Sequence, residues 1–547
     1  TAFYNNTTAS GGVAIGNRAL DANTTGDYNV GIGHDALGAN TTGTLNVAVG
    51  ANALGSNTTA SSNVAVGHAA LNVNTTGASN VALGEQALVA NTTGGSNVAV
   101  GRRSLDDNTT GGSNVSVGNE ALRTNTTGNQ NTAVGASALL SATTASQNVA
   151  VGFNTLDANT TGANNVGVGV GALGANTTAS YNTAVGQVAL TANTTGSYNA
   201  ATGYTALDSN TTGNYNSAYG AYALQANTTG TNNTVMGNAA GYTNTASSYN
   251  TFIGNTAGYN ANGSGATQLV YVGHNSGHLT TTGTINTGVG NQTLYSNTTG
   301  SQNTALGYNA LNQNTTGGNN TAVGSTALDA NTTAGDNTAL GVDAGTANTT
   351  GANSTFCGKG SGSSVTTGGQ NQAFGKLAGT TTTTGENNTS IGYYCRPNAA
   401  ADSNCVVVGS NGMIGKGGTT AFISGGNGPV YAGNNSANFA TTSDRRIKKN
   451  IEDNNTGLDA ISQVRVRNFE YRTADEIDEL PVSAAIDKQG VQLGVIAQEI
   501  QEILPDVVRE ETTGCLSVDP ENMTWYLVNA VKELSAKVTE LESKLGE

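Results

Sequence analysis

The chain has 547 residues, including 76 Gly and 5 Pro, and only 10% of the residues are charged. An ordinary globular chain carries about 25% charged residues, and no stretch here reaches the ~18 apolar residues of a membrane helix, so we expect neither a series of conventional domains nor membrane insertion. The net charge of −15 argues against nucleic acid as a partner, because phosphate binding needs a basic surface.

Signatures of cofactor or metal binding are also missing from the sequence. The four cysteines, Cys357, Cys395, Cys405 and Cys515, are irregularly spaced and form no CxxC pair. Such spacing supports neither a zinc site nor a disulfide framework. We therefore expect no cofactor and no metal site.

A motif of the form N-[VT]-A-V-G recurs every 17 residues along most of the chain. Its starts run from residue 12 to residue 405 and define 24 repeats, with a single 19-residue step between Asn250 and Leu269. A fixed period of this length is typical of a stacked-repeat fold. Residues 1–420 are therefore predicted to form a repetitive β-solenoid shaft, followed by a linker over 421–442.

Asn29–Leu45 illustrates one repeat. Val30 and Ile32 alternate with small residues, as in a short strand with one face turned inward. Gly33 permits a bend, and the Asn-Thr-Thr-Gly stretch that begins at Asn40 is typical of a turn. The pattern predicts a coil with two short strands and two turns.

Coils stacked about 4.8 Å apart place identical residues above one another. Two asparagine columns are then expected to form hydrogen-bonded ladders, one through Asn29, Asn46 and Asn63 and the other through Asn40, Asn57 and Asn74. Each coil supplies few large aliphatic side chains, and this thin core favours several chains packed side by side.

The repeat resembles the head repeats of trimeric autotransporter adhesins and, more closely, the NTTG-type repeats of bacteriophage tail fibres. The resemblance covers roughly residues 1–420. It implies a mainly β fold, in which three chains form a β-solenoid or β-roll rod.

The final 105 residues, 443–547, are a different kind of sequence. They hold 33 of the 55 charged residues and few glycines, and their longer aliphatic patterns predict a small α+β domain. A coiled-coil helix is predicted over 525–547, because apolar residues there follow a 4-3-4-3-4 spacing. These residues are Leu527, Val531, Leu534, Val538, Leu541 and Leu545. The alternative is a helix whose apolar stripe packs on its own domain.

A specific motif, Ser443-Asp444-Arg445-Arg446-Ile447-Lys448-Lys449-Asn450-Ile451, opens this region. Together with Gly494–Ile500 and Leu504-Pro505, it resembles the C-terminal intramolecular chaperone domain of phage tailspikes, endosialidases and fibres. The resemblance implies a homotrimeric chaperone that cleaves itself between Thr442 and Ser443, with Ser443 as nucleophile and Lys448 as general base. It also implies supporting roles for Asp444, Arg445, Arg446, Asn450 and Gln498.

The residues themselves limit the chemistry of such a cleavage. No His follows His278, so a Ser–His pair cannot form within 443–547. A lysine serves as base only when burial or neighbouring cations lower its pKa, and Arg446 and Lys449 lie beside Lys448. The alternative is a cationic run that pairs with acidic neighbours. In either case the reaction is at most a single turnover on the chain itself, without an outside substrate.

These features predict a homotrimeric bacteriophage tail fibre that binds a glycan or protein receptor on the host surface and joins an upstream virion or tail component. The alternative is a trimeric adhesin or appendage on a bacterial cell surface. Five tyrosines are candidate receptor contacts: Tyr181, Tyr198, Tyr215 and Tyr249, expected to stack in one column before the motif Asn, and Tyr259 beside the insertion. Aromatic faces suit carbohydrate, but this column could equally seal the trimer interface.

Overall fold

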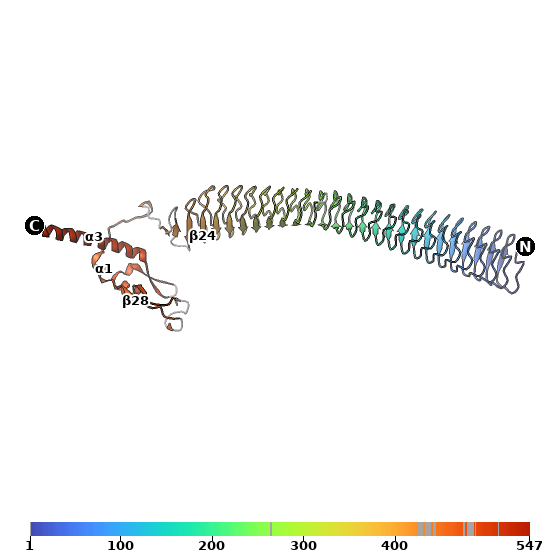
Figure 1. The fold of residues 1–547 in the computed structure, drawn as a ribbon, viewed down its shortest axis with the longest axis horizontal. Helices are drawn as coiled ribbons and strands as arrows, with labels where there is room; N and C mark the ends of the chain where they lie inside the picture. Colours follow the sequence, from blue (N-terminus) through green and yellow to red (C-terminus); the bar gives the residue numbers. More distant parts are fainter. Residues whose placement is uncertain are drawn as a thin grey trace. The chain divides into compact units, whose positions relative to one another are not determined.

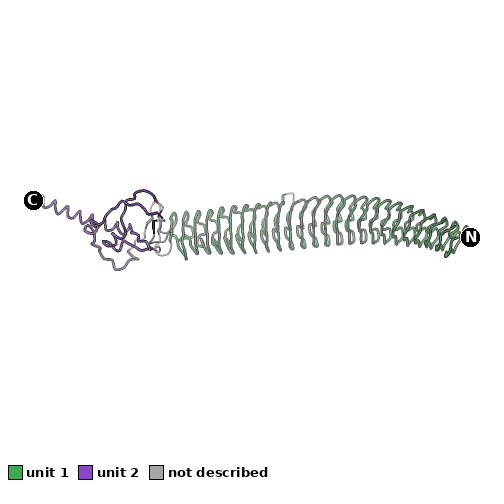
Figure 2. Tube along the Cα trace, turned by 90° about the horizontal axis from the view of Figure 1, so that it is seen from below, with its two compact units in different colours: residues 1–441 green, residues 442–547 purple. Residues whose placement is uncertain are grey.

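The computed structural model describes residues 2–262, 265–424, 430–432, 439–440, 445–473, 476–477, 486, 488–511 and 514–546. The chain divides into two compact units, Thr1–Thr441 and Thr442–Glu547 (Figure 2). The first unit is a parallel β-solenoid, in which coil follows coil along the sequence (Figure 1). This confirms the predicted mainly β repeat fold.

Each coil contributes one short strand to a single parallel sheet. From β1 to β24 every strand residue pairs with the residue 17 positions later, as Val30 does with Val47, except at the insertion, where Thr251 pairs with Val270. The last parallel pair has a shorter step of 15 residues, with Val406 opposite Ala421. The stacked strands are β1 (Val13–Ile15), β2 (Val30–Ile32), β3 (Val47–Val49), β4 (Val64–Val66), β5 (Val81–Leu83), β6 (Val98–Val100), β7 (Val115–Val117), β8 (Thr132–Val134), β9 (Val149–Val151), β10 (Val166–Val168), β11 (Thr183–Val185), β12 (Ala200–Thr202), β13 (Ser217–Tyr219), β14 (Thr234–Met236), β15 (Thr251–Ile253), β16 (Val270–Val272), β17 (Thr287–Val289), β18 (Thr304–Leu306), β19 (Thr321–Val323), β20 (Thr338–Leu340), β21 (Thr355–Cys357), β22 (Gln372–Phe374), β23 (Thr389–Ile391), β24 (Val406–Gly409) and β25 (Ala421–Ser424). Two antiparallel strands, β26 (Val430–Ala432) and β27 (Phe439–Ala440), follow β25.

The prediction of two strands per coil was wrong, because the other side of the coil is closed by turns. Three non-glycine residues of one coil, Asp35, Leu37 and Leu45, adopt left-handed backbone angles with φ of 54°, 54° and 60°. Such residues cannot continue an extended strand. Their coils are nevertheless bonded to one another, since the Leu37 N–H donates to the Ala53 carbonyl at 3.0 Å and the Thr41 N–H to the Thr58 carbonyl at 2.8 Å.

The inside of the coil is filled by small residues and one leucine column. In β3 the middle residue, Ala48, is fully buried, whereas Val47 and Val49 on either side of it are partly exposed. Leu37 and Leu54 are also fully buried. The strand therefore turns its small residue inward and its β-branched residues outward.

The predicted asparagine ladders are confirmed. In the second column, the Asn57 side-chain amide donates to the Asn40 Oδ1 atom at 2.8 Å and to the Ala60 carbonyl at 3.0 Å. In the first column, Asn29 Oδ1 accepts the Asn46 backbone N–H at 2.9 Å. All of these asparagines are fully buried, so the ladders satisfy polar groups that water cannot reach.

Among the described residues, three fully buried aromatic side chains lie inside the coils, and each is matched by a glycine. Phe252 and Phe356 occupy the middle strand position, and Gly258 and Gly362 stand six residues later, where other coils have leucine. Tyr271 has the same relation to Gly277. A Cβ atom at Gly258 would lie only 2.6 Å from the Phe252 ring. The large side chain thus stands at the middle strand position instead of the leucine position, and the volume of the core is conserved.

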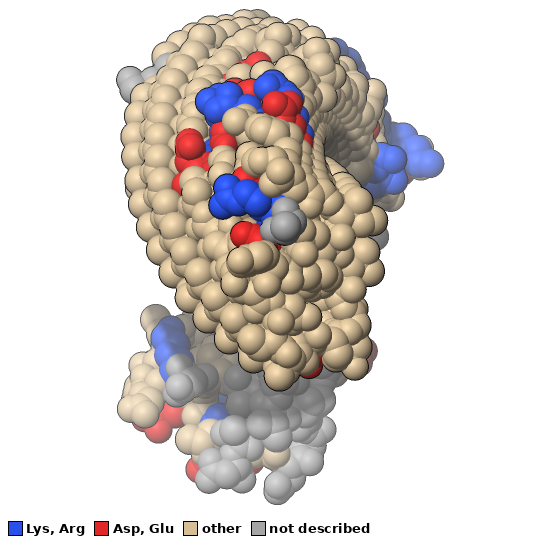
Figure 3. Space-filling model, turned by 90° about the vertical axis from the view of Figure 1, so that its right-hand side faces the viewer, with Lys and Arg blue, Asp and Glu red and all other residues tan. Residues whose placement is uncertain are grey.

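The solenoid carries few charges, and most of the surface seen in Figure 3 is uncharged. Charged side chains of opposite sign lie together in small groups on it. Examples are Arg18 with Asp35 at 3.1 Å and Arg103 with Asp106 at 2.7 Å.

The second unit is a small α+β fold that ends in a long helix, as predicted. Its elements are the 3-10 helix η1 (Arg445–Ile447), α1 (Leu458–Gln463), β28 (Arg467–Phe469), β29 (Gln492–Gly494), α2 (Ala497–Ile503), the 3-10 helix η4 (Pro505–Val507), β30 (Val508–Glu510), β31 (Leu516–Val518) and α3 (Pro520–Leu545). Strand β28 pairs with β29, and β30 with β31, both antiparallel. Ile500, Leu504, Val507 and Tyr526 form its core. None of the helices in the described part of the chain has the length and apolarity to span a membrane.

Candidate self-cleavage and assembly site

The predicted cleavage site is described only on its C-terminal side. Thr442, Ser443 and Asp444 lie outside the described residues. Arg445 belongs to η1, and its carbonyl accepts the Lys448 N–H at 3.2 Å. The side chain of Lys448 is exposed to solvent. The described part of its own chain therefore does not supply the burial that a lysine base needs.

The other residues of the motif lie near Lys448 in the sequence and at the surface. Arg445, Arg446 and Asn450 are all exposed, and Asn450 has a left-handed φ of 52°. A left-handed asparagine is typical of a tight turn, so the segment changes direction there.

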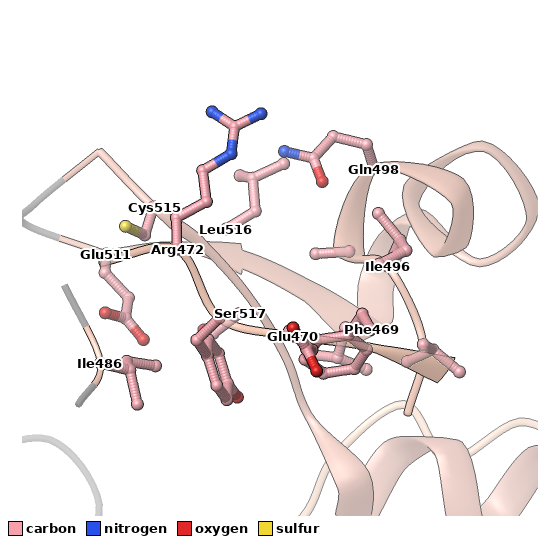
Figure 4. Close-up of a pocket in the computed structure, with 14 residues that line it drawn as sticks. Phe469, Glu470, Arg472, Ile486, Ile496, Gln498, Glu511, Cys515, Leu516 and Ser517 are labelled. Carbon is pink, nitrogen blue, oxygen red and sulfur yellow. The ribbon is translucent and has the colours of Figure 1, made fainter. Parts of the chain in front are cut away.

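Gln498 lies apart from this motif in the sequence, in the first turn of α2 and at the edge of a surface cavity of about 630 Å³ (Figure 4). The cavity is lined by the end of β28 and the chain after it, by Ile486, by the start of α2 and by the region around β31. Glu470, Arg472, Cys515 and Ser517 are among the lining residues. Sequence analysis identified only the lining residues within Gly494–Ile500, because no spacing rule connects segments that are far apart in the sequence. In the described part of the chain, no group of three or more His, Cys, Asp or Glu side chains is placed to hold a metal ion.

An ion pair fixes the start of α2 against β28. The Arg467 guanidinium donates to Glu499 through Nη2 at 2.6 Å and Nε at 3.3 Å. These hydrogen bonds lower the pKa of the Glu499 carboxyl. Because Gln498 precedes Glu499 directly, the same pair sets the position of Gln498 at the cavity.

One face of α3 packs on its own unit. The Tyr526 hydroxyl donates to Asp506 at 2.5 Å, and this hydrogen bond, together with burial, raises the pKa of Tyr526. Glu533 accepts the Leu458 N–H at 3.0 Å, and Asn529 donates to the Asn454 carbonyl at 2.7 Å. These contacts hold the first half of α3 against the rest of the unit.

The heptad seam lies on another face of α3 and is exposed. The exposed fractions are 46% for Leu527, 64% for Val531, 50% for Leu534, 45% for Val538, 59% for Leu541 and 86% for Leu545. The seam extends over about 27 Å at 1.5 Å per residue. Both alternatives concerned this stripe, and in the single chain it is exposed, whereas a different face of α3 packs on the unit.

The candidate receptor tyrosines form two separate columns. Tyr181, Tyr198 and Tyr215 stack with ring centroids 4.9 and 5.0 Å apart. Tyr249 does not stack with them, contrary to the prediction, because the coil between carries Asn232. All four are about half exposed or more.

Tyr259 belongs to a column that the sequence analysis did not identify. It stacks on Tyr242 at 5.1 Å and on His278 at 5.0 Å, and His278 stacks on Tyr295 at 5.2 Å. Burial lowers the pKa of His278. The signal was present in the sequence, since these residues follow the repeat spacing, with the 19-residue step between Tyr259 and His278.

Comparison with known proteins identifies the second unit. Residues 443–509 match the family described as chaperone of endosialidase, so the repeat solenoid is followed by a chaperone domain of this type. The chain is also homologous to long tail fibre proteins of bacteriophages. It is 35% identical over 119 residues to the long tail fiber protein Gp37 of Enterobacteria phage K3 and to that of Enterobacteria phage T2.

These similarities cover limited parts of the proteins compared. The match to Gp37 takes in 21% of this chain and 9% of the phage K3 protein or 8% of the phage T2 protein. Myelin regulatory factor homolog 1 of Caenorhabditis elegans is 29% identical over 112 residues, which are 20% of this chain and 12% of that protein. The chain thus matches about a tenth of the length of these relatives. No solved structure matches it.

Proposed function

We propose that this chain is the shaft and assembly domain of a homotrimeric bacteriophage tail fibre. The observation that carries the proposal is the order of its two parts: a 17-residue repeat solenoid, followed from Ser443 by a region that matches the chaperone of endosialidase family. Homology to two phage long tail fibre proteins supports a location in the virion tail.

A repetitive shaft needs such a chaperone for a physical reason. Each coil pairs with the next through the same 17-residue register, so neighbouring chains shifted by one coil would make nearly the same contacts. A separately folded C-terminal unit with an exposed helical seam fixes chain number and register before the coils associate. Valine at two of the three a positions, Val531 and Val538, with leucine at the d positions favours two-stranded coils, so the number three rests on the family resemblance and not on the seam.

Self-cleavage at Thr442–Ser443 is the second part of the proposal. The Ser443 hydroxyl attacks the Thr442 carbonyl carbon and forms an ester as the peptide C–N bond breaks, which frees the Ser443 amine. Water then hydrolyses the ester and leaves a Thr442 carboxylate and a restored Ser443 hydroxyl. In the first step neutral Lys448 accepts the hydroxyl proton and passes it to the departing Ser443 nitrogen, which leaves as an amine. Because Lys448 is exposed in the single chain, the proposal requires a neighbouring chain to bury it.

The tyrosines are proposed to contact the receptor through different parts of their rings. Both faces of Tyr198 are covered by Tyr181 and Tyr215, so only its edge and hydroxyl are offered to a ligand. Tyr249, 63% exposed, has no aromatic neighbour in its column. An open ring face suits a sugar, and we expect Tyr249→Ala to weaken binding to extracted cell-surface glycans more than Tyr198→Ala does.

The experiment that tests the function measures binding of the fluorescently labelled full chain to intact bacteria and to cells stripped of surface glycans. A fibre binds one group of host strains, and the loss of binding after stripping identifies a glycan receptor. Binding that survives stripping but not protease treatment identifies a protein receptor. If a correctly assembled chain bound no bacterial surface across a broad panel, the receptor-binding function would be wrong.

A further inference from the structure

The outer face of the solenoid sheet carries a continuous column of apolar side chains. The third residue of each strand from β1 to β24 points away from the coil interior, and it is Val, Ile, Leu, Met, Phe, Tyr or Cys in every strand except β12, where it is Thr202. Many of these side chains are more than a third exposed, among them Ile15 at 59%, Met236 at 51% and Leu306 at 46%. This outer column is a feature of the whole solenoid and not of one coil.

The coil's own core does not need these side chains. The middle strand residues, such as Ala65 and Ala99, and the leucine column, including Leu71 and Leu105, already fill the interior and are fully buried. An apolar residue at the third strand position is therefore not needed to fill the interior of its own coil, yet it recurs at almost every coil.

Charge is excluded from the same face. Residues 1–442 contain 22 Lys, Arg, Asp or Glu side chains, but none stands at the first or third position of β1 to β24. The first positions are occupied mainly by Val and Thr. A solvated face would be expected to carry some of these charges, whereas the core of an interface is depleted of them.

We infer that parallel copies of this chain, aligned coil to coil, pack against one another through the outer column. A partner that covers this face must present apolar groups at the spacing of the coils along the whole solenoid. A second copy of the chain does so, because its coils have the same spacing. The 24 strands at ~4.8 Å per coil, each three residues wide at ~3.3 Å per residue, give a face of roughly 1,100 Å² per chain. A standard protein interface buries about 800 Å² on each partner, so the face is large enough for stable association.

This inference rests on the proposed homotrimer and specifies its interface. The outer columns of the three chains face a common axis, and the other sides of the coils, including the tyrosine columns, face outward. Parallel association of the exposed α3 seams is the arrangement that brings these columns into register.

Cys357 offers a direct probe, because it occupies the third position of β21 and is partly exposed. Cys395 and Cys405 are fully buried, so Cys515→Ser leaves Cys357 as the accessible thiol of the full chain. Treatment with a short bifunctional maleimide is expected to link two of the three chains into a covalent dimer, seen on a denaturing gel. The matched control carries Cys357→Ala, Cys515→Ser and Lys359→Cys, which moves the thiol two residues along the same coil to an exposed position.

The outcomes separate the inference from the function on which it depends. Dimers from Cys357 and few from Lys359→Cys support the outer column as the interface. If Lys359→Cys links as well as or better than Cys357 in a chain that sediments as a trimer, the outer column is not the interface, although the chain is a trimer. A chain that sediments as a monomer and links at neither position overturns the homotrimer and the interface together.

Discussion

Two glutamates in the α3 seam should dissociate the assembled chain. Leu534 and Leu541 are 50% and 59% exposed in the single chain, so assembly buries roughly half of each side chain. Full burial of a leucine contributes about 1.5–3 kcal/mol, which leaves ~1 kcal/mol for each of these residues. Since three chains contribute two leucines each, Leu534→Glu with Leu541→Glu should remove ~6 kcal/mol from trimer formation. This corresponds to about four powers of ten in the dissociation constant.

Sedimentation equilibrium of the full chain, in its wild-type and double-variant forms, measures the effect. The matched control is Ala536→Glu with Ser543→Glu, which adds the same charge at the same seven-residue spacing on the exposed opposite face of α3. Circular dichroism checks that the helix persists in both variants. If the seam variant stayed as strongly associated as the control, the seam would not be an interface and the reasoning from its exposure would fail.

Three further predictions concern cleavage, the core and pH. Ser443→Ala and Lys448→Arg should both give an intact chain on denaturing mass spectrometry, because the first lacks the nucleophile and a guanidinium cannot accept the proton; prompt cleavage in either would exclude that residue from its role. Phe356→Ala should destabilise its coils by ~3–5 kcal/mol, measured by hydrogen exchange. Adding Gly362→Leu should restore most of this, since Gly362 has φ of 57° and the column leucines adopt similar angles; no recovery would refute the volume exchange. Because the pKa of His278 is lowered, its stabilising contribution is present above the ordinary pKa of ~6.5 and is lost as pH falls through the folded value. Hydrogen-exchange protection in the coils that hold His278, corrected for the intrinsic exchange rate, should therefore fall on acidification, and His278→Gln should remove that response; an unchanged response would assign it to another group.

The repeat architecture could be predicted because stacking forces identical residues into contact. Asn40 and Asn57 had to meet once the period was 17, and the ladder follows from their chemistry. Which side chains of each strand point into the coil could not be predicted in the same way. Val30 and Ile32 alternate with Gly31, and alternation identifies two faces without saying which one is inside. The single strand per coil was missed because left-handed leucines such as Leu37 carry no recognisable sequence signal.

The candidate site was predictable only where it is local in sequence. The seam of α3 follows from the heptad spacing of Leu527 to Leu545. The cavity at Gln498 was not predictable, since it depends on how β28, α2 and β31 pack. The Tyr249 error arose from one coil, in which Asn232 replaces the tyrosine that the column would need.

The central claim is that the C-terminal unit assembles the repeat shaft, and truncation tests it most directly. Residues 1–442 and the full chain are expressed in parallel, and the soluble fraction of each is analysed by sedimentation velocity. We expect a single trimeric species from the full chain and insoluble or heterogeneous material from residues 1–442. Equal yields of a uniform trimer from the truncated chain would contradict it.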